Sequence, residues 1–262
     1  MIMTILDKIA DNARKRVEAA KRAVPLPTLK KQVDTLCTDT GLPFEAALRA
    51  PGLSFICEVK KASPSKGVIA ADFPYLWIAR EYETAGASAI SVLTEPDFFS
   101  GSGEYLQEIA RAVRIPVLRK DFIVDEYQIY EAKLWGASAV LLICALLDIR
   151  TLTAYISLCG RLGLSALVEA HDAHEVAAAV QSGARVIGVN NRDLKTFNVD
   201  LNISRRLRPL IPPPILFVSE SGIHTADDVR GLIGIGADAV LIGEALMKAD
   251  NKKAYLDMLR VR

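Results

Sequence analysis

Short apolar runs alternate with amphipathic stretches along most of this chain, from residue 53 onward. The amphipathic stretches carry apolar residues at helical spacing, and the runs between them are rich in Val, Ile and Leu. Strands that are apolar along their whole length are typical of a parallel sheet covered by helices. Strands are predicted at residues 53–60, 88–93, 116–120, 138–143, 165–169, 185–190, 215–219 and 238–242, each followed by a helix.

Eight parallel strands favour a closed barrel over an open doubly wound sheet. An open sheet would be expected to carry a GxGxxG turn after its first strand, and this chain has none there. A Gly-Ala step also recurs before four of the predicted strands, at Gly86, Gly136, Gly183 and Gly236. Glycine suits a helix C-terminus, so we interpret these four residues as architecture. We predict an α/β fold, a (β/α)8 TIM barrel.

The first 50 residues follow a different pattern. Apolar residues recur every three or four positions between residues 3 and 22, which predicts an amphipathic helix. Pro25 and Pro27 interrupt it, and a shorter helix is predicted at 43–49. We expect one barrel domain over residues 1–262, of which residues 1–50 form an N-terminal helical extension. The pattern leaves two positions open for its first helix, over the barrel mouth or against the barrel flank.

Composition and charge argue against several classes of partner. Lys and Arg number 32 against 31 Asp and Glu, and 51% of the residues are hydrophobic. Because positive and negative charges nearly cancel, the net charge gives no electrostatic basis for binding nucleic acid or an acidic membrane surface. The apolar run at 137–147 is shorter than the roughly 20 residues that span a bilayer, and the N-terminus has no apolar signal segment. We expect a cytoplasmic protein that acts on a small molecule, with no membrane or nucleic-acid partner.

The four cysteines fit the same compartment. They are Cys37, Cys57, Cys144 and Cys159, they have no CxxC spacing, and most of them lie in apolar runs. Buried free thiols are therefore expected rather than disulfides or a zinc site. No metal site is predicted.

Charged and polar residues collect where the predicted strands end. In a (β/α)8 barrel the carboxyl ends of all strands meet at one rim, which carries the active site. One charged strand end could be a solvated or ion-paired rim residue, but five together favour a functional site. These residues are Glu58, Lys60, Arg119, Lys120, Asp121, Glu169, His171, Asn190, Asn191, Arg192, Asp193, Ser219, Glu220, Ser221 and Gly222.

The last two strands predict a phosphate site. The seventh strand runs into Ser221 and Gly222, and the eighth runs into Gly243 and Glu244 at the start of a helix. Backbone N–H groups after these two strands, next to a helix N-terminus, form the common phosphate site of this fold. The glycines would let the backbone come close to the anion, and the basic loop that begins at Lys60 suits a small anion as well.

Seven motifs, in order along the predicted barrel, resemble the indole-3-glycerol-phosphate synthase family of tryptophan biosynthesis. A resemblance of this extent goes well beyond a shared fold. The motifs are FICEVKKASPSKG at 55–67, SVLTE at 91–95, LRKDFI at 118–123, LVEAH at 167–171, GVNNRDL at 188–194, VSESGI at 218–223 and LIGEALM at 241–247.

The resemblance implies a reaction and its general acid-base groups. The substrate would be 1-(2-carboxyphenylamino)-1-deoxyribulose 5-phosphate, cyclised with loss of carbon dioxide and water to indole-3-glycerol phosphate, without a cofactor. By position, Lys120 resembles the acid at the ribulose carbonyl, and Glu169 the carboxylate of the later proton transfer. Lys60 resembles a second lysine with two open roles, binding phosphate and carboxylate or acting as the acid in dehydration. Transient contact with other tryptophan-pathway enzymes is left open.

The remaining positions resemble residues that hold the substrate. Glu58 and Asn190 match groups that hold the sugar hydroxyls and the catalytic side chains, and Ser63 and Arg192 match the surroundings of the carboxylate. The apolar slot for the anthranilate ring is matched by Phe99, Phe122 and Leu194.

The proton transfers of this reaction require the same residue types. Attack of an aromatic carbon on a ketone needs a proton for the developing alkoxide, which a lysine supplies if desolvation and nearby positive charge lower its pKa. We expect Lys60 and Arg119 to be the cations that lower the pKa of Lys120. Loss of the hydroxyl then needs an acid, with a base for the ring proton, and two lysines with one glutamate meet that need.

Two other hypotheses are weaker. A sugar-phosphate isomerase on the same barrel, such as phosphoribosylanthranilate isomerase, would keep the phosphate site but would not need two lysines and Arg192 around a carboxylate. A non-catalytic scaffold that binds a phosphorylated metabolite would not need the set of Lys60, Lys120 and Glu169.

Overall fold

The strands close into a barrel in a computed structural model that describes residues 4–194 and 196–260. Strand β1 (Ser54–Val59) closes the barrel by pairing in parallel with both β4 (Ala89–Leu93) and β10 (Ala239–Ile242). The other strands are β5 (Val117–Lys120), β6 (Ala139–Ile143), β7 (Ser165–Ala170), β8 (Val186–Asn190) and β9 (Leu216–Glu220). The predicted (β/α)8 TIM barrel is confirmed, and every predicted strand agrees with the structure to within one residue at each end.

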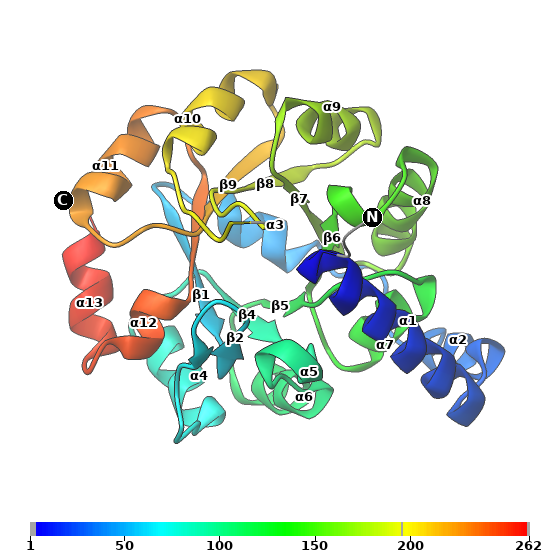
Figure 1. Ribbon diagram of the computed structural model, residues 1–262. Coiled ribbons are helices and arrows are strands. Elements are labelled where there is room, and N and C mark those ends of the chain that lie inside the picture. The colour runs from blue at the N-terminus through cyan, green and yellow to red at the C-terminus, as the bar shows by residue number, and fades with distance from the viewer. Residues whose placement is uncertain (1–3, 195, 261–262) are drawn as a thin grey trace.

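The helices that connect the strands form an outer layer around the barrel (Figure 1). Asp or Thr side chains cap several of them by accepting a hydrogen bond from the first turn. Gly86, Gly136, Gly183 and Gly236 end four of them with φ between 77° and 87°, which confirms their architectural role. The outer helices are α4 (Tyr75–Thr84), α5 (Pro96–Phe99), α6 (Gly103–Ala112), α7 (Glu126–Leu134), α8 (Ile149–Arg161), α9 (Ala173–Gln181), α10 (Asn202–Leu207), α11 (Ala226–Gly234), α12 (Glu244–Lys248) and α13 (Lys252–Leu259), with the 3-10 turns η1 (Cys144–Leu146) and η2 (Arg208–Leu210).

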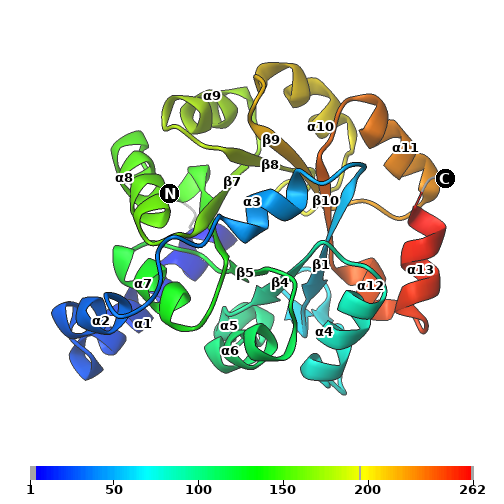
Figure 2. The ribbon, with the colours of Figure 1, turned by 180° about the vertical axis from the view of Figure 1, so that it is seen from behind.

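Alternating side chains divide the core into two layers. In β1, Ile56 belongs to the cluster inside the barrel, whereas Phe55 and Cys57 belong to the cluster between strands and helices. Phe44 and Leu48 of α3 (Pro43–Leu48) join the inner cluster. Helix α3 therefore closes one end of the barrel, and it crosses the front of the view from behind (Figure 2).

Helix α1 (Ile5–Ala23) lies at the opposite end, in front of the barrel in Figure 1. Thr4 and Asp7 form a capping box at its start, so the predicted helix is confirmed from residue 5, while residue 3 lies outside the described residues. Ile5, Leu6 and Ile9 line the cavity at the barrel mouth. The first turns of α1 thus cover the mouth, while α2 (Leu26–Val33) packs against α7 on the flank.

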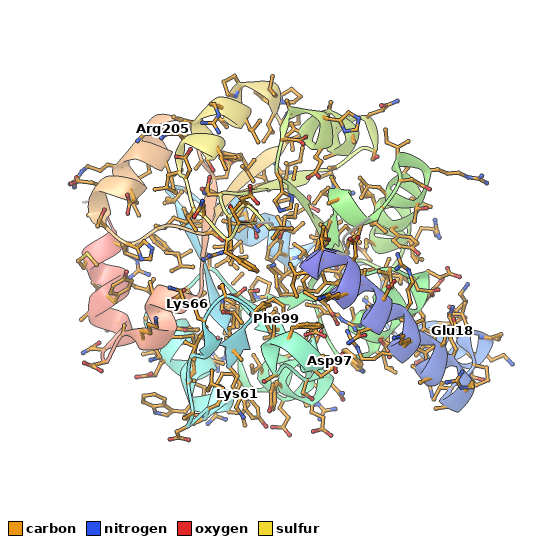
Figure 3. All side chains as sticks on the ribbon, viewed as in Figure 1. Glu18, Lys61, Lys66, Asp97, Phe99 and Arg205 are labelled. Carbon is orange, nitrogen blue, oxygen red and sulfur yellow. The ribbon has the colours of Figure 1, made fainter. Side chains whose placement is uncertain are left out.

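The basic loop after β1 forms a short antiparallel hairpin from β2 (Ala62–Ser63) and β3 (Gly67–Val68). The hairpin contacts α5, and Lys66 and Phe99 lie near the centre of the view into the mouth (Figure 3).

The four cysteines are free, and Cys57 and Cys159 are buried as expected. Cys144 is half-buried, and the expectation of burial is wrong for Cys37, which lies in the exposed segment between α2 and α3.

Candidate active site

A cavity of about 180 Å³ opens at the carboxyl ends of the strands. The structure brings all of the predicted catalytic, substrate-binding and phosphate-binding residues to its walls. These are Glu58, Lys60, Ser63, Phe99, Lys120, Phe122, Glu169, Asn190, Arg192, Leu194, Ser221, Gly222, Gly243 and Glu244.

Two lysine-glutamate pairs face each other inside this cavity. Lys120 Nζ lies 3.4 Å from Glu169 Oε2, and Lys60 Nζ lies 2.6 Å from Glu58 Oε1. Asn190 Nδ2 donates a hydrogen bond of 3.2 Å to the other oxygen of Glu169. The lysine side chains are 17% exposed and the carboxylates 5% or less, so both pairs are largely shielded from water. Shielding strengthens each charge interaction in the site.

The protonation of Lys120 and Glu169 follows from their pairing. Burial alone would lower the pKa of Lys120, but the charges of Glu169, Glu220 and Glu58 outweigh burial and raise it. Burial would likewise raise the pKa of Glu169, but the charge of Lys120 and contacts with His171 hold it well below its usual range. The expectation of a lowered pKa at Lys120 is therefore wrong. The site holds an ammonium group beside a carboxylate.

Arg119 is not a neighbour of the Lys120 ammonium, because adjacent side chains of a strand point to opposite faces. Its Nη2 lies 3.0 Å from Asp121 Oδ2 in the layer between the barrel and α7. The same alternation takes Asn191 and Ser219 out of the cavity, where Asn191 Nδ2 donates to Ser219 Oγ at 3.0 Å. These strand-end residues support the rim rather than line the site.

The chain turns sharply beside the predicted phosphate site. Ser221 and Gly222 follow β9 with φ of 68° and 86°. Gly243 packs against the Glu58–Lys60 pair, and a Cβ there would overlap Glu58 Oε1 and lie 3.0 Å from Lys60 Nζ. Glycine therefore lets this backbone approach the end of β1 closely without displacing the pair.

An apolar wall lies beside the charged groups. The rings of Phe99 and Phe122 are 5.8 Å apart between centroids. Leu194 joins them, and α1 adds Ile5 and Leu6 to the lining. The sequence pattern identifies Ile5 only as part of the apolar face of a helix and does not single out Leu6, because an amphipathic period does not show what the helix covers.

Two further residues, which the sequence pattern places at the rim but without a specific role, reach the charged centre. Glu220 at the end of β9 is buried among the described residues, with no hydrogen bond to Oε1. Burial and the charge of Glu169 raise its pKa to about 8. Gly188 on β8 makes room for it, since a Cβ there would overlap Glu220 Oε1. The signal that could have found Glu220 is a glutamate at an inward position of a strand, in register with Asn190.

The second residue is His171, one position beyond β7. Its Nε2 lies 3.2 Å from Glu169 Oε1. A histidine two residues after an inward-facing glutamate shares its side of the strand, which is the signal that could have identified it.

Neither a metal site nor a membrane span is found in the part of the chain that is described. Residues 4–194 and 196–260 contain no group of three or more His, Cys, Asp or Glu side chains that could hold a metal ion. None of the described helices is both long and apolar enough to cross a membrane.

Comparisons with known proteins agree with one another. The model of the indole-3-glycerol phosphate synthase family matches residues 6–259. A protein of that name from Ruminiclostridium cellulolyticum is 57% identical over 256 residues, covering 98% of each chain. Another, from Lachnoclostridium phytofermentans, is 48% identical over 267 residues, again covering 98% of each chain. The solved structure of a 3-hexulose-6-phosphate synthase superposes with a TM-score of 0.65 at 14% identity, over 79% of this chain and 98% of that chain, which shows the fold alone.

Proposed function

The chain belongs to the indole-3-glycerol phosphate synthase family, and we propose that its Lys120–Glu169 pair carries out the proton transfers of that family's reaction. It is a carboxy-lyase of tryptophan biosynthesis. The reaction cyclises 1-(2-carboxyphenylamino)-1-deoxyribulose 5-phosphate to indole-3-glycerol phosphate, with release of carbon dioxide and water. The isomerase and the non-catalytic scaffold are thereby excluded. The observation that carries the proposal is the shielded contact between Lys120 and Glu169 inside the cavity.

Lys120 acts as the acid in ring closure. A carbon-carbon bond forms between the ring carbon that bears the carboxylate and the ketone carbon, while the ketone oxygen takes a proton from the Lys120 ammonium. The carboxylates around Lys120 keep it protonated for this step. The ring carbon then loses its carboxyl group as carbon dioxide, and the electron pair returns to the ring.

Glu169 acts as the base in dehydration. The hydroxyl formed by ring closure leaves as water after it takes a proton from Lys120, which solvent has reprotonated after ring closure. The Glu169 carboxylate then removes the proton whose loss completes the indole. The low pKa of Glu169 keeps it ionised for this role, and the bond from Asn190 fixes its other oxygen. The raised pKa of Glu220 favours its uncharged form, which limits the negative charge beside this carboxylate.

Lys60 binds the phosphate group. Its ammonium lies next to the backbone of Gly243, after the last strand, where this fold commonly binds phosphate. Glu58 holds it there at 2.6 Å. The backbone N–H groups of Ser221, Gly222, Gly243 and Glu244 complete the phosphate site.

The other end of the substrate lies between polar and apolar walls. Arg192 and Ser63 face the carboxylate, and Phe99, Phe122 and Leu194 enclose the anthranilate ring. The α1 residues that line the same cavity support a single working domain over residues 1–262, with residues 1–50 as its extension. We also infer a cytoplasmic location, supported by the four free cysteines.

Turnover of the carboxyphenylamino substrate by the purified chain, followed by indole fluorescence, tests these roles. Lys120→Met and Glu169→Gln should each lower kcat by about 100- to 10,000-fold, the usual contribution of a general acid or base. Lys253→Met, on the exposed face of α13, is the matched control and should leave kcat unchanged. Full activity in Lys120→Met would remove it from the acid role.

A further inference from the structure

The imidazole of His171 lies between two carboxylates. Nε2 lies 3.2 Å from Glu169 Oε1, and Nδ1 lies 3.0 Å from Glu175 Oε2. The same Glu175 oxygen accepts a 2.8 Å hydrogen bond from the backbone N–H of His171. Glu175 is in turn fixed in the first turn of α9, where its N–H donates to the capping side chain of Asp172 at 2.9 Å. The β7–α9 connection thus holds the imidazole at its ring and at its backbone.

The groups around His171 favour its charged form. Burial would lower the pKa of the imidazole, but Glu169 and Glu175 outweigh burial and raise it to about 10. The facing groups are Glu169 on β7, Glu175 in the first turn of α9 and Glu220 at the end of β9. The half-buried Cys144 of η1 donates its S–H to the backbone carbonyl of Glu175. His171 also lines a second cavity, together with Arg192 and Asp193.

We propose that His171 is a positioning residue, an imidazolium fixed by Glu175 that holds Glu169 Oε1 and thereby turns Oε2 toward Lys120. The proposal rests on the proposed role of Glu169 as the catalytic base. Oε1 accepts a hydrogen bond from Asn190 and lies within ion-pair distance of His171 Nε2, which makes no hydrogen bond among the described residues, while Oε2 faces the ammonium. One oxygen is therefore anchored, and the other is presented to the reacting atoms.

Charge balance gives His171 a second effect on Glu169. Glu58, Glu169 and Glu175 pair with Lys60, Lys120 and His171, and Glu220 lies beside them with a raised pKa. Without the imidazolium, Glu169 keeps a single cationic partner and becomes easier to protonate. His171 is absent from the lining of the main cavity, so its loss acts on catalysis rather than on substrate binding.

The test is the pH dependence of kcat in His171→Gln, which keeps an N–H donor but loses the charge. At neutral pH we expect kcat to fall about tenfold with KM within about twofold. The acid limb of the kcat profile should move up by about one pH unit, as Glu169 becomes easier to protonate. The matched control is His174→Gln, on the exposed side of α9, whose profile should overlie that of the parent enzyme.

Glu175→Gln tests the same positioning role without changing the imidazole, because it removes the carboxylate that fixes His171. It tests the proposal on its own if His171→Gln does not fold. It should move the acid limb in the same direction by a smaller amount. An unmoved acid limb in the folded variants overturns the role of His171, while loss of activity in Glu169→Gln would still support the proposed function. Full activity in Glu169→Gln would instead overturn both.

Discussion

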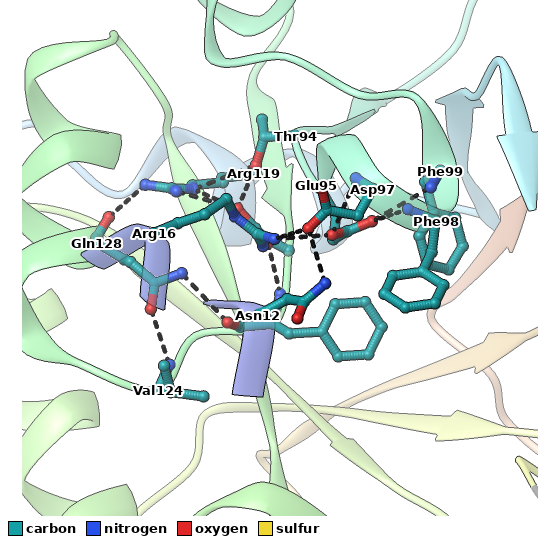
Figure 4. A network of polar contacts seen from close by, with 12 residues as sticks. Asn12, Arg16, Thr94, Glu95, Asp97, Phe98, Phe99, Arg119, Val124 and Gln128 are labelled. Carbon is teal, nitrogen blue, oxygen red and sulfur yellow. Dashed lines mark hydrogen bonds and ion pairs between the residues drawn. The ribbon is translucent and has the colours of Figure 1, made fainter. Parts of the chain in front are cut away.

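The guanidinium of Arg16 on α1 lies 3.0 Å from the fully buried carboxylate of Glu95, just beyond β4 (Figure 4). Glu95 also accepts hydrogen bonds from three backbone N–H groups of α5, including that of Phe99. Phe99 and Ile5 line the cavity from these two elements. The Arg16–Glu95 pair therefore joins two walls of the apolar slot.

Breaking this pair should loosen α1 over the barrel mouth. Arg16→Met keeps the aliphatic stem but leaves Glu95 buried without its cation, which should lower the free energy of unfolding by about 1–3 kcal/mol. We expect KM to rise about tenfold with a smaller change in kcat, because the slot binds the anthranilate ring. Steady-state kinetics and urea unfolding measure the two effects.

The control is Arg14→Met, two residues earlier on α1, where the arginine is 56% exposed and pairs with Asp11 on the surface. Surface pairs of this kind contribute about 0–1 kcal/mol. Equal values of KM in the two variants would contradict a role for Arg16 at the mouth.

Ser221 should contribute to binding more than to turnover. Ser221→Ala removes a hydroxyl beside the proposed phosphate site, but the backbone donors around it remain. KM should therefore rise about five- to tenfold while kcat stays within about threefold. Ser100→Ala is the control for placing alanine at a left-handed backbone position, because Ser100 has a φ of 52° and Ser221 one of 68°. A fall in kcat alone would place Ser221 in the chemistry instead.

Replacing Gly243 with alanine should leave the fold stable but disturb the active site. The added Cβ would overlap the ends of Glu58 and Lys60, which are side-chain atoms that can move aside. We expect Gly243→Ala to keep its thermal unfolding midpoint within a few degrees, while kcat/KM falls about 100-fold as the pair is displaced. Gly234→Ala on α11 is the control, because a Cβ there meets nothing within 4 Å. Wild-type kinetics in Gly243→Ala would show that the pair needs no fixed position.

The sequence predicts the positions of the strands well because each is a short apolar run between polar turns. It also places Lys120 and Glu169 at one rim, since parallel strands end on the same side of a barrel. It did not separate Arg119 from Lys120, although strand alternation puts their side chains on opposite faces.

Protonation was harder to predict, because it depends on neighbours from distant strands. Lys120 meets Glu169, two strands away around the barrel, together with Glu58 and Glu220. These carboxylates reverse the expected direction of its pKa shift. Likewise, the pair that ties α1 to the segment after β4 joins Arg16 and Glu95, which lie 79 positions apart.

Glu220 should make the stability of the protein depend on pH in a direction opposite to that of a paired carboxylate. Its pKa is raised from 4.5 to about 8 by burial and the charge of Glu169, so the folded state holds this proton more tightly than the unfolded state. Stability therefore falls as pH rises from 4.5 to 8, by at most about 1.4 kcal/mol per pH unit from this group. Glu220→Gln replaces the acid with a neutral side chain that resembles its protonated form. The variant should therefore not show this fall in stability as pH rises.

The expected result is a difference in unfolding free energy, variant minus parent, that grows between pH 4.5 and pH 8 and is constant above. Urea unfolding at several pH values across this window measures it. Glu104→Gln, an exposed glutamate on α6, should show no comparable growth. A difference for Glu220→Gln that stays constant with pH would mean that Glu220 is ionised in the folded protein, and the site would then hold one more negative charge beside Glu169.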